Sequence, residues 1–165
     1  MPLYPSKVAL TVHDELVGRA RELAPKIARK ARETENRRSI DPEILQDLID
    51  AEFFQLFVPR RWGGHEAGLQ THLEVVDIIS SACLSTGWIA AFYMGHNWMA
   101  LRFPEQAQEE FFADRPFALI PITNAPTLSA KRADGGWIVS GRSAWGSGIM
   151  DADWACLAGT RRGRG

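Results

Sequence analysis

The sequence predicts an α+β fold that is mainly α, with the helices first and the strands after them. Apolar residues recur at helical spacing through the first two thirds of the 165 residues, whereas short segments that suit strands follow Pro116. We therefore expect a helical domain over residues 1–115 and a β-domain that begins at residue 116 and runs to 165. An apolar content of 45% is enough for a substantial core.

Two helices are expected before residue 55. Leu16 and Ile27 belong to an apolar face with helical spacing, and Pro25 should kink or split that first helix. Asp41 and Pro42 form a start signal for the second helix, because an N-cap acid precedes a proline at the first helical position. The apolar face of this second helix continues to residue 54.

Three more helices follow a loop that contains the glycine pair at 63 and 64. Val75 and Ile79 lie on the apolar face of the third helix. The fourth helix runs from about Ser85, whose hydroxyl could cap it, to about residue 101. Pro104 opens a fifth, acidic helix.

Four strands are expected after residue 116, over residues 117–122, 127–132, 136–141 and 153–158. Asp134, Gly135 and Gly136 predict a hairpin turn, and residues 121–127 are expected to form a loop between the first two strands. Alternating residues over 136–142 predict a half-buried strand. Because such a sheet would keep an exposed edge, we expect a truncated chain.

The composition argues against several classes of function. Lysine and arginine total 19 against 20 acidic residues, so no excess of positive charge points to nucleic acid or to a membrane surface. Cys83 and Cys156 have no metal-site spacing, and the histidines and acids also lack it, so no metal site is expected. No signal peptide or membrane-spanning run is visible, which predicts a cytoplasmic protein.

A serine between two glycines is the first candidate for chemistry. Gly146 and Gly148 flank Ser147, so the backbone can approach a flat ligand closely while one hydroxyl points at it. The alternative is an ordinary turn serine. Trp145 could stack on the same ligand or be a core residue of a strand.

A histidine on a very apolar helix is the second candidate. Trp88, Phe92 and His96 lie at positions i, i+4 and i+8 and so share one helix face. A histidine in an aromatic pocket could accept a phenol proton near neutral pH. The alternative is a hydrogen-bonded core histidine.

Residues 136–154 resemble the central β-domain of acyl-CoA dehydrogenase-fold flavoproteins, most closely the two-component aromatic hydroxylases of the p-hydroxyphenylacetate hydroxylase oxygenase type. The resemblance covers about residues 15–160. It implies the N-terminal helical domain of that fold followed by an incomplete β-barrel domain, with the C-terminal helical bundle absent. It also implies that Ser147 contacts the flavin N5 edge, with Gly148 and Trp145 beside it.

The resemblance assigns further residues to the site. The segment from Ser85 to His96 is similar to one whose histidine faces the aromatic substrate, so it implies catalytic roles for His96 and Ser147. Substrate contacts would come from Trp88, Phe92, His96 and Thr123, and flavin contacts from Trp145, Ser147, Gly148, Asn124 and Thr127. Related hydroxylases carry a serine near position 122, where this chain has Ile122, so Thr123 is the candidate substitute.

The implied activity is hydroxylation of an aromatic or phenolic substrate through a C4a-hydroperoxyflavin. The cofactor would be reduced flavin, either FMN or FAD. The partners would be a small aromatic substrate, O₂ and a separate flavin reductase, and the full-length form would be a homo-oligomer, a tetramer. Two alternatives remain open: an acyl-CoA dehydrogenase that uses FAD, and a truncated product without catalytic activity.

Overall fold

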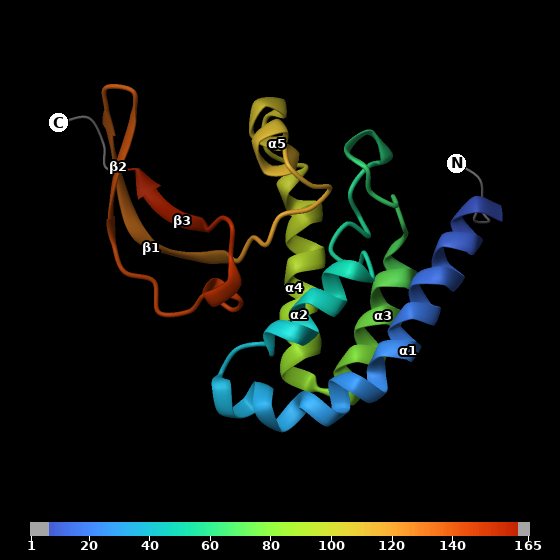
Figure 1. The fold of residues 1–165 in the computed structure, drawn as a ribbon. Coiled ribbons are helices and arrows are strands. Elements are labelled where there is room, and N and C mark those ends of the chain that lie inside the picture. Colours follow the sequence, from blue (N-terminus) through green and yellow to red (C-terminus); the bar gives the residue numbers. More distant parts are fainter. Residues whose placement is uncertain (1–6, 162–165) are drawn as a thin grey trace.

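The computed structural model describes residues 7–161, and Figure 1 shows a group of helices followed by a small sheet. The prediction of a mainly helical α+β fold is confirmed. The elements are, in order, α1 (Lys7–Arg37), α2 (Pro42–Asp50), the 3₁₀ turn η1 (Arg60–Trp62), α3 (Leu69–Ala82), α4 (Leu84–Ala100), α5 (Glu105–Phe112), β1 (Ile122–Ala133), β2 (Gly136–Gly141), the 3₁₀ turn η2 (Ile149–Asp151) and β3 (Cys156–Arg161).

The main core lies among α1, α2, α3 and α4. The long helix α1 packs along α3, which packs along α4 (Figure 1). Side chains from each of these helices and from the segment after α2 meet in this core, and several are fully buried: Leu16, Ile27, Leu48, Phe53, Phe54, Ile79 and Tyr93. This apolar burial is the main stabilising contribution to the helical part.

Proline does not split the first helix. Pro25 lies inside α1, which continues as one helix from residue 7 to residue 37 and bends along its length (Figure 1). The sequence predicts a kink or a split at Pro25, and the split does not occur. Core packing of Leu16 before Pro25 and of Ile27 after it holds both halves, which offsets the hydrogen bond that proline removes.

The start of α2 is confirmed, but its end is not where the apolar pattern placed it. The Asp41 side chain accepts a hydrogen bond from the Glu43 backbone N–H at 2.9 Å, as an N-cap does. The helix stops at Asp50, since Glu52 adopts a left-handed φ of 61°. The predicted cap of α4 is also wrong: Cys83 is its N-cap, and Ser85 already lies in the first turn.

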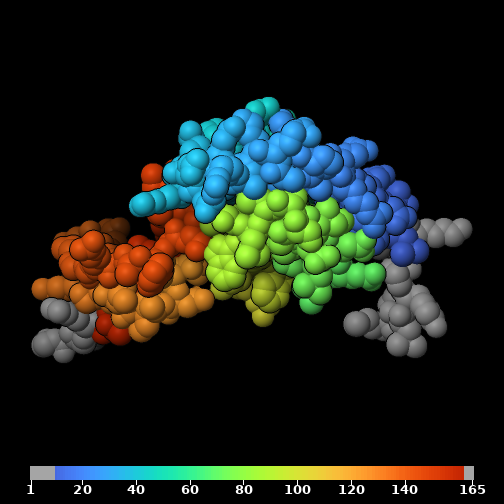
Figure 2. All heavy atoms as spheres, turned by 90° about the horizontal axis from the view of Figure 1, so that it is seen from below, coloured from blue at the N-terminus to red at the C-terminus, as the bar shows by residue number. Residues whose placement is uncertain are grey.

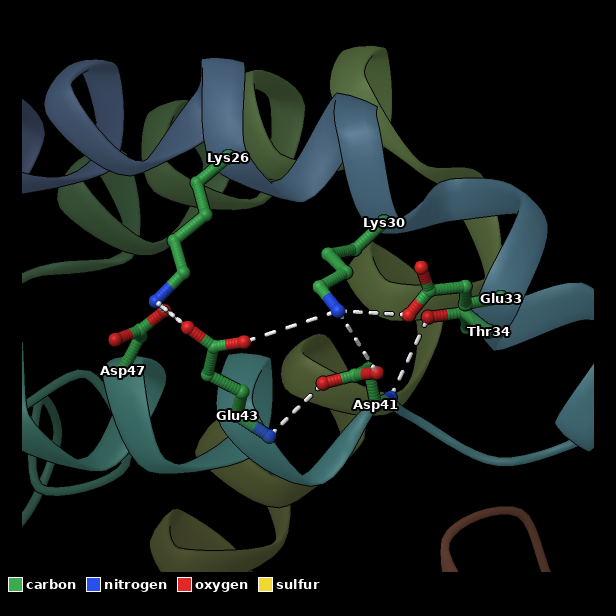
Figure 3. Close-up of polar contacts among 7 residues, drawn as sticks. All are labelled: Lys26, Lys30, Glu33, Thr34, Asp41, Glu43 and Asp47. Carbon is green, nitrogen blue, oxygen red and sulfur yellow. Dashed lines mark hydrogen bonds and ion pairs between the residues drawn. The ribbon is translucent and has the colours of Figure 1, made fainter.

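Charged side chains tie α1 to the start of α2 (Figure 3). The Lys26 ammonium lies 2.6 Å from an Asp47 carboxylate oxygen and 2.8 Å from one of Glu43. Hydrogen bonds to Asp47 and then to Glu43 raise the pKa of Lys26. The same contact with Lys26 lowers the pKa of Glu43. These ion pairs link α1 to the first turns of α2.

A second lysine, one turn further along α1, completes this network (Figure 3). The Lys30 ammonium lies 2.7 Å from Glu33 and 3.7 Å from Asp41. The Asp41 backbone N–H donates to the Thr34 hydroxyl at 3.4 Å. Thus the residue that caps α2 is held by the last turns of α1.

The sheet has three strands in the order β2–β1–β3. β1 pairs antiparallel with β2, through the predicted turn at Asp134 and Gly135, and parallel with β3. The predicted loop at 121–127 is wrong, because β1 runs without a break from Ile122 to Ala133. The pairing of β1 with β3 instead shifts register between Thr123 and Leu128, and this irregularity accommodates Pro126 within the strand.

The segment expected as the first strand is extended but belongs to no sheet. Residues 117–120 are buried, and their polar backbone groups bond to side chains and to the backbone of residues 153–154 instead of to a neighbouring strand. Four expected strands therefore become three. Likewise β2 is not half-buried: all six of its residues are exposed.

Candidate functional site

An aromatic row along one face of α4 begins the site. The rings of Trp88 and Phe92 are 4.9 Å apart between centroids and nearly perpendicular, and those of Phe92 and His96 are 5.1 Å apart. Exposure falls along the row, because Trp88 is 56% exposed whereas His96 is 7% exposed. The predicted i, i+4, i+8 face is thus one continuous aromatic surface that leads inward from solvent to the histidine.

His96 is held in one orientation by the backbone. Its Nδ1 lies 2.6 Å from the Ile120 carbonyl oxygen. Since a carbonyl only accepts, Nδ1 carries the proton, and Nε2 is left as the unprotonated nitrogen of the neutral ring. Burial lowers the pKa of His96, partly offset by the hydrogen bond to Ile120. The residue is therefore hydrogen-bonded in the core and also a neutral base at pH 7.

The Ile120 carbonyl is positioned by a residue that the sequence analysis missed. Asn97 is fully buried, and its amide donates to the Ala118 carbonyl oxygen at 2.9 Å and accepts from the Ala118 N–H at 2.9 Å. The two bonds bracket residues 117–120 against α4. In the sequence, the one sign of this role of Asn97 is a polar residue next to His96 on a largely apolar helix.

The Gly146–Gly148 turn meets the outer end of the aromatic row. The Trp88 indole Nε1 donates to the Ser147 hydroxyl oxygen at 3.2 Å. This contact joins two predicted site residues that are 59 positions apart in the chain. The Ser147 side chain is exposed, and its own hydroxyl proton has no acceptor among residues 7–161.

Tyr93 fixes the same turn from inside. Its hydroxyl donates to the Gly148 carbonyl oxygen. Burial, and then the carboxylates of Asp151 and Asp153, raise the pKa of Tyr93, so the hydroxyl stays protonated and can donate. Gly148 has a φ of 87°, and a Cβ there would lie 2.8 Å from the Tyr93 ring. A glycine is therefore required at 148 for the turn to sit against α4.

Trp145 is not a core residue of a strand. Its side chain is 85% exposed, in the loop between β2 and η2. Its carbonyl oxygen accepts from the Thr123 hydroxyl at 3.3 Å, so Thr123 lies beside the turn. A hollow of about 170 Å³ lies between β1 and this loop and is lined by Thr123, Trp145 and Gly146 among others.

Asn124 and Thr127 are not brought to Ser147. Both lie on β1 with exposed side chains. Asn124 lines a different hollow, of about 660 Å³, beside Trp98 and Arg102 at the end of α4. Thr127 lies further along the strand, where its backbone oxygen faces Gly141.

The residues around the turn fit a flavin. Ser147 presents a free hydroxyl proton that can bond to a polar ring edge, and Trp145 presents an exposed indole face that can pack on a planar ring. No group of three metal-ligating side chains converges within residues 7–161. In the same part of the chain, no helix is long and apolar enough to cross a membrane.

Several known proteins are similar to this chain. A pigment production hydroxylase of Rhodococcus sp. is 41% identical over 145 residues, which cover 88% of this chain and 38% of that protein. An FADH(2)-dependent resorcinol hydroxylase, oxygenase component, of Rhizobium sp. is 35% identical, with 88% and 36% covered. The chain thus spans under two fifths of the length of these relatives.

Solved structures share the fold. The 3-HSA hydroxylase of Rhodococcus sp. RHA1 superposes with a TM-score of 0.85 at 36% identity, covering 90% of this chain and 39% of that one. XiaF from Streptomyces sp., solved in complex with FADH2 and glycerol, gives a TM-score of 0.88 at 29% identity, with 93% and 39% covered. Residues 11–115 match the family model described as acyl-CoA dehydrogenase, N-terminal domain. Since that match spans more than half of the chain, the protein belongs to the acyl-CoA dehydrogenase family.

Proposed function

We propose that this protein acts in a flavin-dependent monooxygenase as the oxygenase component, which hydroxylates an aromatic or phenolic substrate. The observation that carries this proposal is the hydrogen bond from Trp88 to Ser147, because it places the aromatic row of α4 against the glycine-flanked serine. Relatives named as hydroxylases, and the solved structure with FADH2, support the same activity.

The cofactor in this proposal is reduced flavin, either FMN or FAD. Ser147 donates a hydrogen bond to the N5 edge, Gly148 lets the backbone come close, and the exposed Trp145 ring packs on the flavin. Thr123, which was expected to contact the substrate, donates its hydroxyl to the Trp145 carbonyl and so supports the turn in this proposal. Asn124 and Thr127 on β1 contact parts of the cofactor away from Ser147. When bound, the flavin supplies the reaction with O₂.

Three residues of α4 handle the substrate. Trp88 and Phe92 form the aromatic wall against which a phenol ring packs, and they exclude water from it. His96 accepts the phenol proton at Nε2, because Nδ1 is committed to the Ile120 carbonyl and burial keeps the ring neutral. Removing that proton makes the ring carbon more electron-rich, which favours hydroxylation.

The partners follow from the same proposal. A separate reductase would supply the reduced flavin, because the resorcinol hydroxylase relative is itself named as an oxygenase component. On the basis of the resemblance, the protein is proposed to form a homotetramer. Exposed apolar side chains on β2, such as Trp137 and Val139, support a sheet face that is covered in the assembly. Light scattering of the purified protein tests this assembly.

The test supplies reduced FMN or FAD from an unrelated reductase and measures hydroxylated product and H₂O₂ from a panel of phenols. His96→Asn keeps a donor for the Ile120 carbonyl but has no base, so the rate should fall roughly 10²- to 10⁴-fold. Ser147→Ala should divert O₂ into H₂O₂. The matched control is Ser129→Ala, on β1, which should change neither. Oxidation of an acyl-CoA instead, or unchanged variants, would contradict the proposal.

A further inference from the structure

A cavity of about 570 Å³ lies where three distant segments of the chain meet. The end of α1 and the segment after it form one side, the start of α4 forms the second, and residues 148–151 form the third. In Figure 2 these segments, coloured light blue, yellow-green and orange-red, adjoin on one face of the molecule.

The cavity wall is mostly apolar. Its apolar lining residues are Ile40, Leu84, Trp88, Ile89 and Met150. Leu84 is 72% exposed at the first position of α4. A polar residue could stand there without loss of helix stability, so the helix itself does not require this leucine. An exposed leucine, tryptophan and methionine around one hollow mark a ligand-binding surface.

The cavity adjoins the outer end of the proposed site. Trp88 and Gly148 line the cavity, and they are also the residues on either side of the Ser147 contact. From Trp88 the aromatic row continues along α4 to His96, about 12 Å further at 1.5 Å per residue. A molecule that lies along this face therefore has its reacting end toward His96 and its other end in the cavity.

The size of the cavity indicates what that other end is. A cavity of about 150 Å³ holds benzene, whereas this one is several times larger. Its charged lining residues are one cation, Arg38, and two carboxylates, Glu35 and Asp151, so the lining disfavours an anionic group. An uncharged ring system matches both the volume and the lining.

We propose that this cavity binds the non-reacting part of a phenol with two or more rings, and that Leu84 and Met150 set the preference for it over a one-ring phenol. The proposal rests on the proposed hydroxylase function. Its binding step needs no flavin, however, so it is testable separately.

Calorimetric titration of the purified protein with 4-(2-phenylethyl)phenol, whose two-carbon bridge sets its two rings well apart, and with phenol, without flavin, tests the inference. We expect 4-(2-phenylethyl)phenol to bind on the order of tenfold more tightly, because its second ring is buried in the cavity. Leu84→Arg should weaken the binding of 4-(2-phenylethyl)phenol at least fivefold. Leu73→Arg is the matched control, since Leu73 is 59% exposed on α3 and does not line the cavity.

Thermal melting of both arginine variants shows that they are folded before binding is compared. Equal affinity for the two phenols, or equal weakening by the two variants, would overturn the inference even if the protein hydroxylates phenol. Conversely, selective binding of 4-(2-phenylethyl)phenol without any hydroxylation would support the cavity assignment and overturn the proposed function. The two failures are therefore distinguishable.

Discussion

Replacing Asn97 by alanine tests how the site is held in place. The buried Asn97 amide is the partner of both backbone groups of Ala118, at 2.9 Å each, and it also donates to the Tyr93 carbonyl at 2.8 Å. The Tyr93 carbonyl lies within α4 and can rely on its helix hydrogen bond. The groups left without a partner are therefore chiefly the Ala118 N–H and C=O.

The magnitude follows from those two groups. A buried backbone group left without a partner costs about 1–3 kcal/mol, so two of them cost about 2–6 kcal/mol. A domain of this size is stable by only about 5–15 kcal/mol, and Asn97→Ala therefore removes a large fraction of its stability. The bracket also orients the Ile120 carbonyl, so the His96 Nδ1 proton should lose its fixed acceptor.

Urea unfolding followed by circular dichroism measures the free energy of unfolding, and amide exchange at Ala118 reports the local bond. Asn36→Ala is the control, because Asn36 is exposed on α1 and the same change there should stay within about 0.5 kcal/mol. A loss below 1 kcal/mol for Asn97→Ala, with the Ala118 amide still protected, would refute the reasoning.

Three further predictions concern the helix network and the turn. Because contact with Lys26 lowers the pKa of Glu43, the stabilisation is complete above about pH 4.5, the ordinary pKa of this group, and is lost as pH falls below it. Glu43→Gln should therefore flatten the dependence of Tm on pH between 3 and 5, and an unchanged slope would count against the network. Gly148→Ala should cost at least about 1–2 kcal/mol in chemical unfolding from its left-handed backbone alone, whereas Gly146→Ala, whose added Cβ only touches a side chain at 3.5 Å, should cost much less. Trp88→Phe removes the donor to Ser147 but keeps an aromatic wall, so flavin turnover should yield more H₂O₂ per product while KM for the phenol changes little; a raised KM alone would contradict this division of roles.

Local signals in the sequence were sufficient for the presence of the helices, though not for all of their ends, and for one row of the site. The Asp41 cap needs only its own neighbours to form, and the face shared by Trp88 and His96 follows from helix geometry once α4 exists. Such features depend on residues within a few positions of one another, which is why spacing alone predicts them.

The contacts that complete the site join residues far apart in the chain. Tyr93 reaches Gly148 across 55 positions, and Asn97 reaches Ala118 across 21. Neither pairing has a periodic signature, because each depends on how the sheet and its loops dock on α4. The sequence therefore carries no signal for the roles of Tyr93 and Asn97.

Strand prediction failed where tertiary contacts replace sheet pairing. Residues 117–120 have the apolar character of a buried strand, but side chains such as Asn97 and the backbone of residues 153–154 satisfy their backbone groups instead of a neighbouring strand. At 121–127 a proline suggested a loop, yet a register shift lets β1 carry Pro126. The exposed position of Trp145 likewise depends on the loop path and not on its strand-like neighbours.

The proposed function requires the turn at 145–148 to hold reduced flavin against α4. Anaerobic titration of the protein with reduced FMN and reduced FAD, followed by tryptophan fluorescence and calorimetry, measures this directly. We expect saturable binding that weakens at least tenfold in Trp145→Ala and in Ser147→Ala. Trp137→Ala, which removes a half-exposed indole on β2, should leave the affinity unchanged. Absence of binding, or equal affinity in all three variants, would contradict the account.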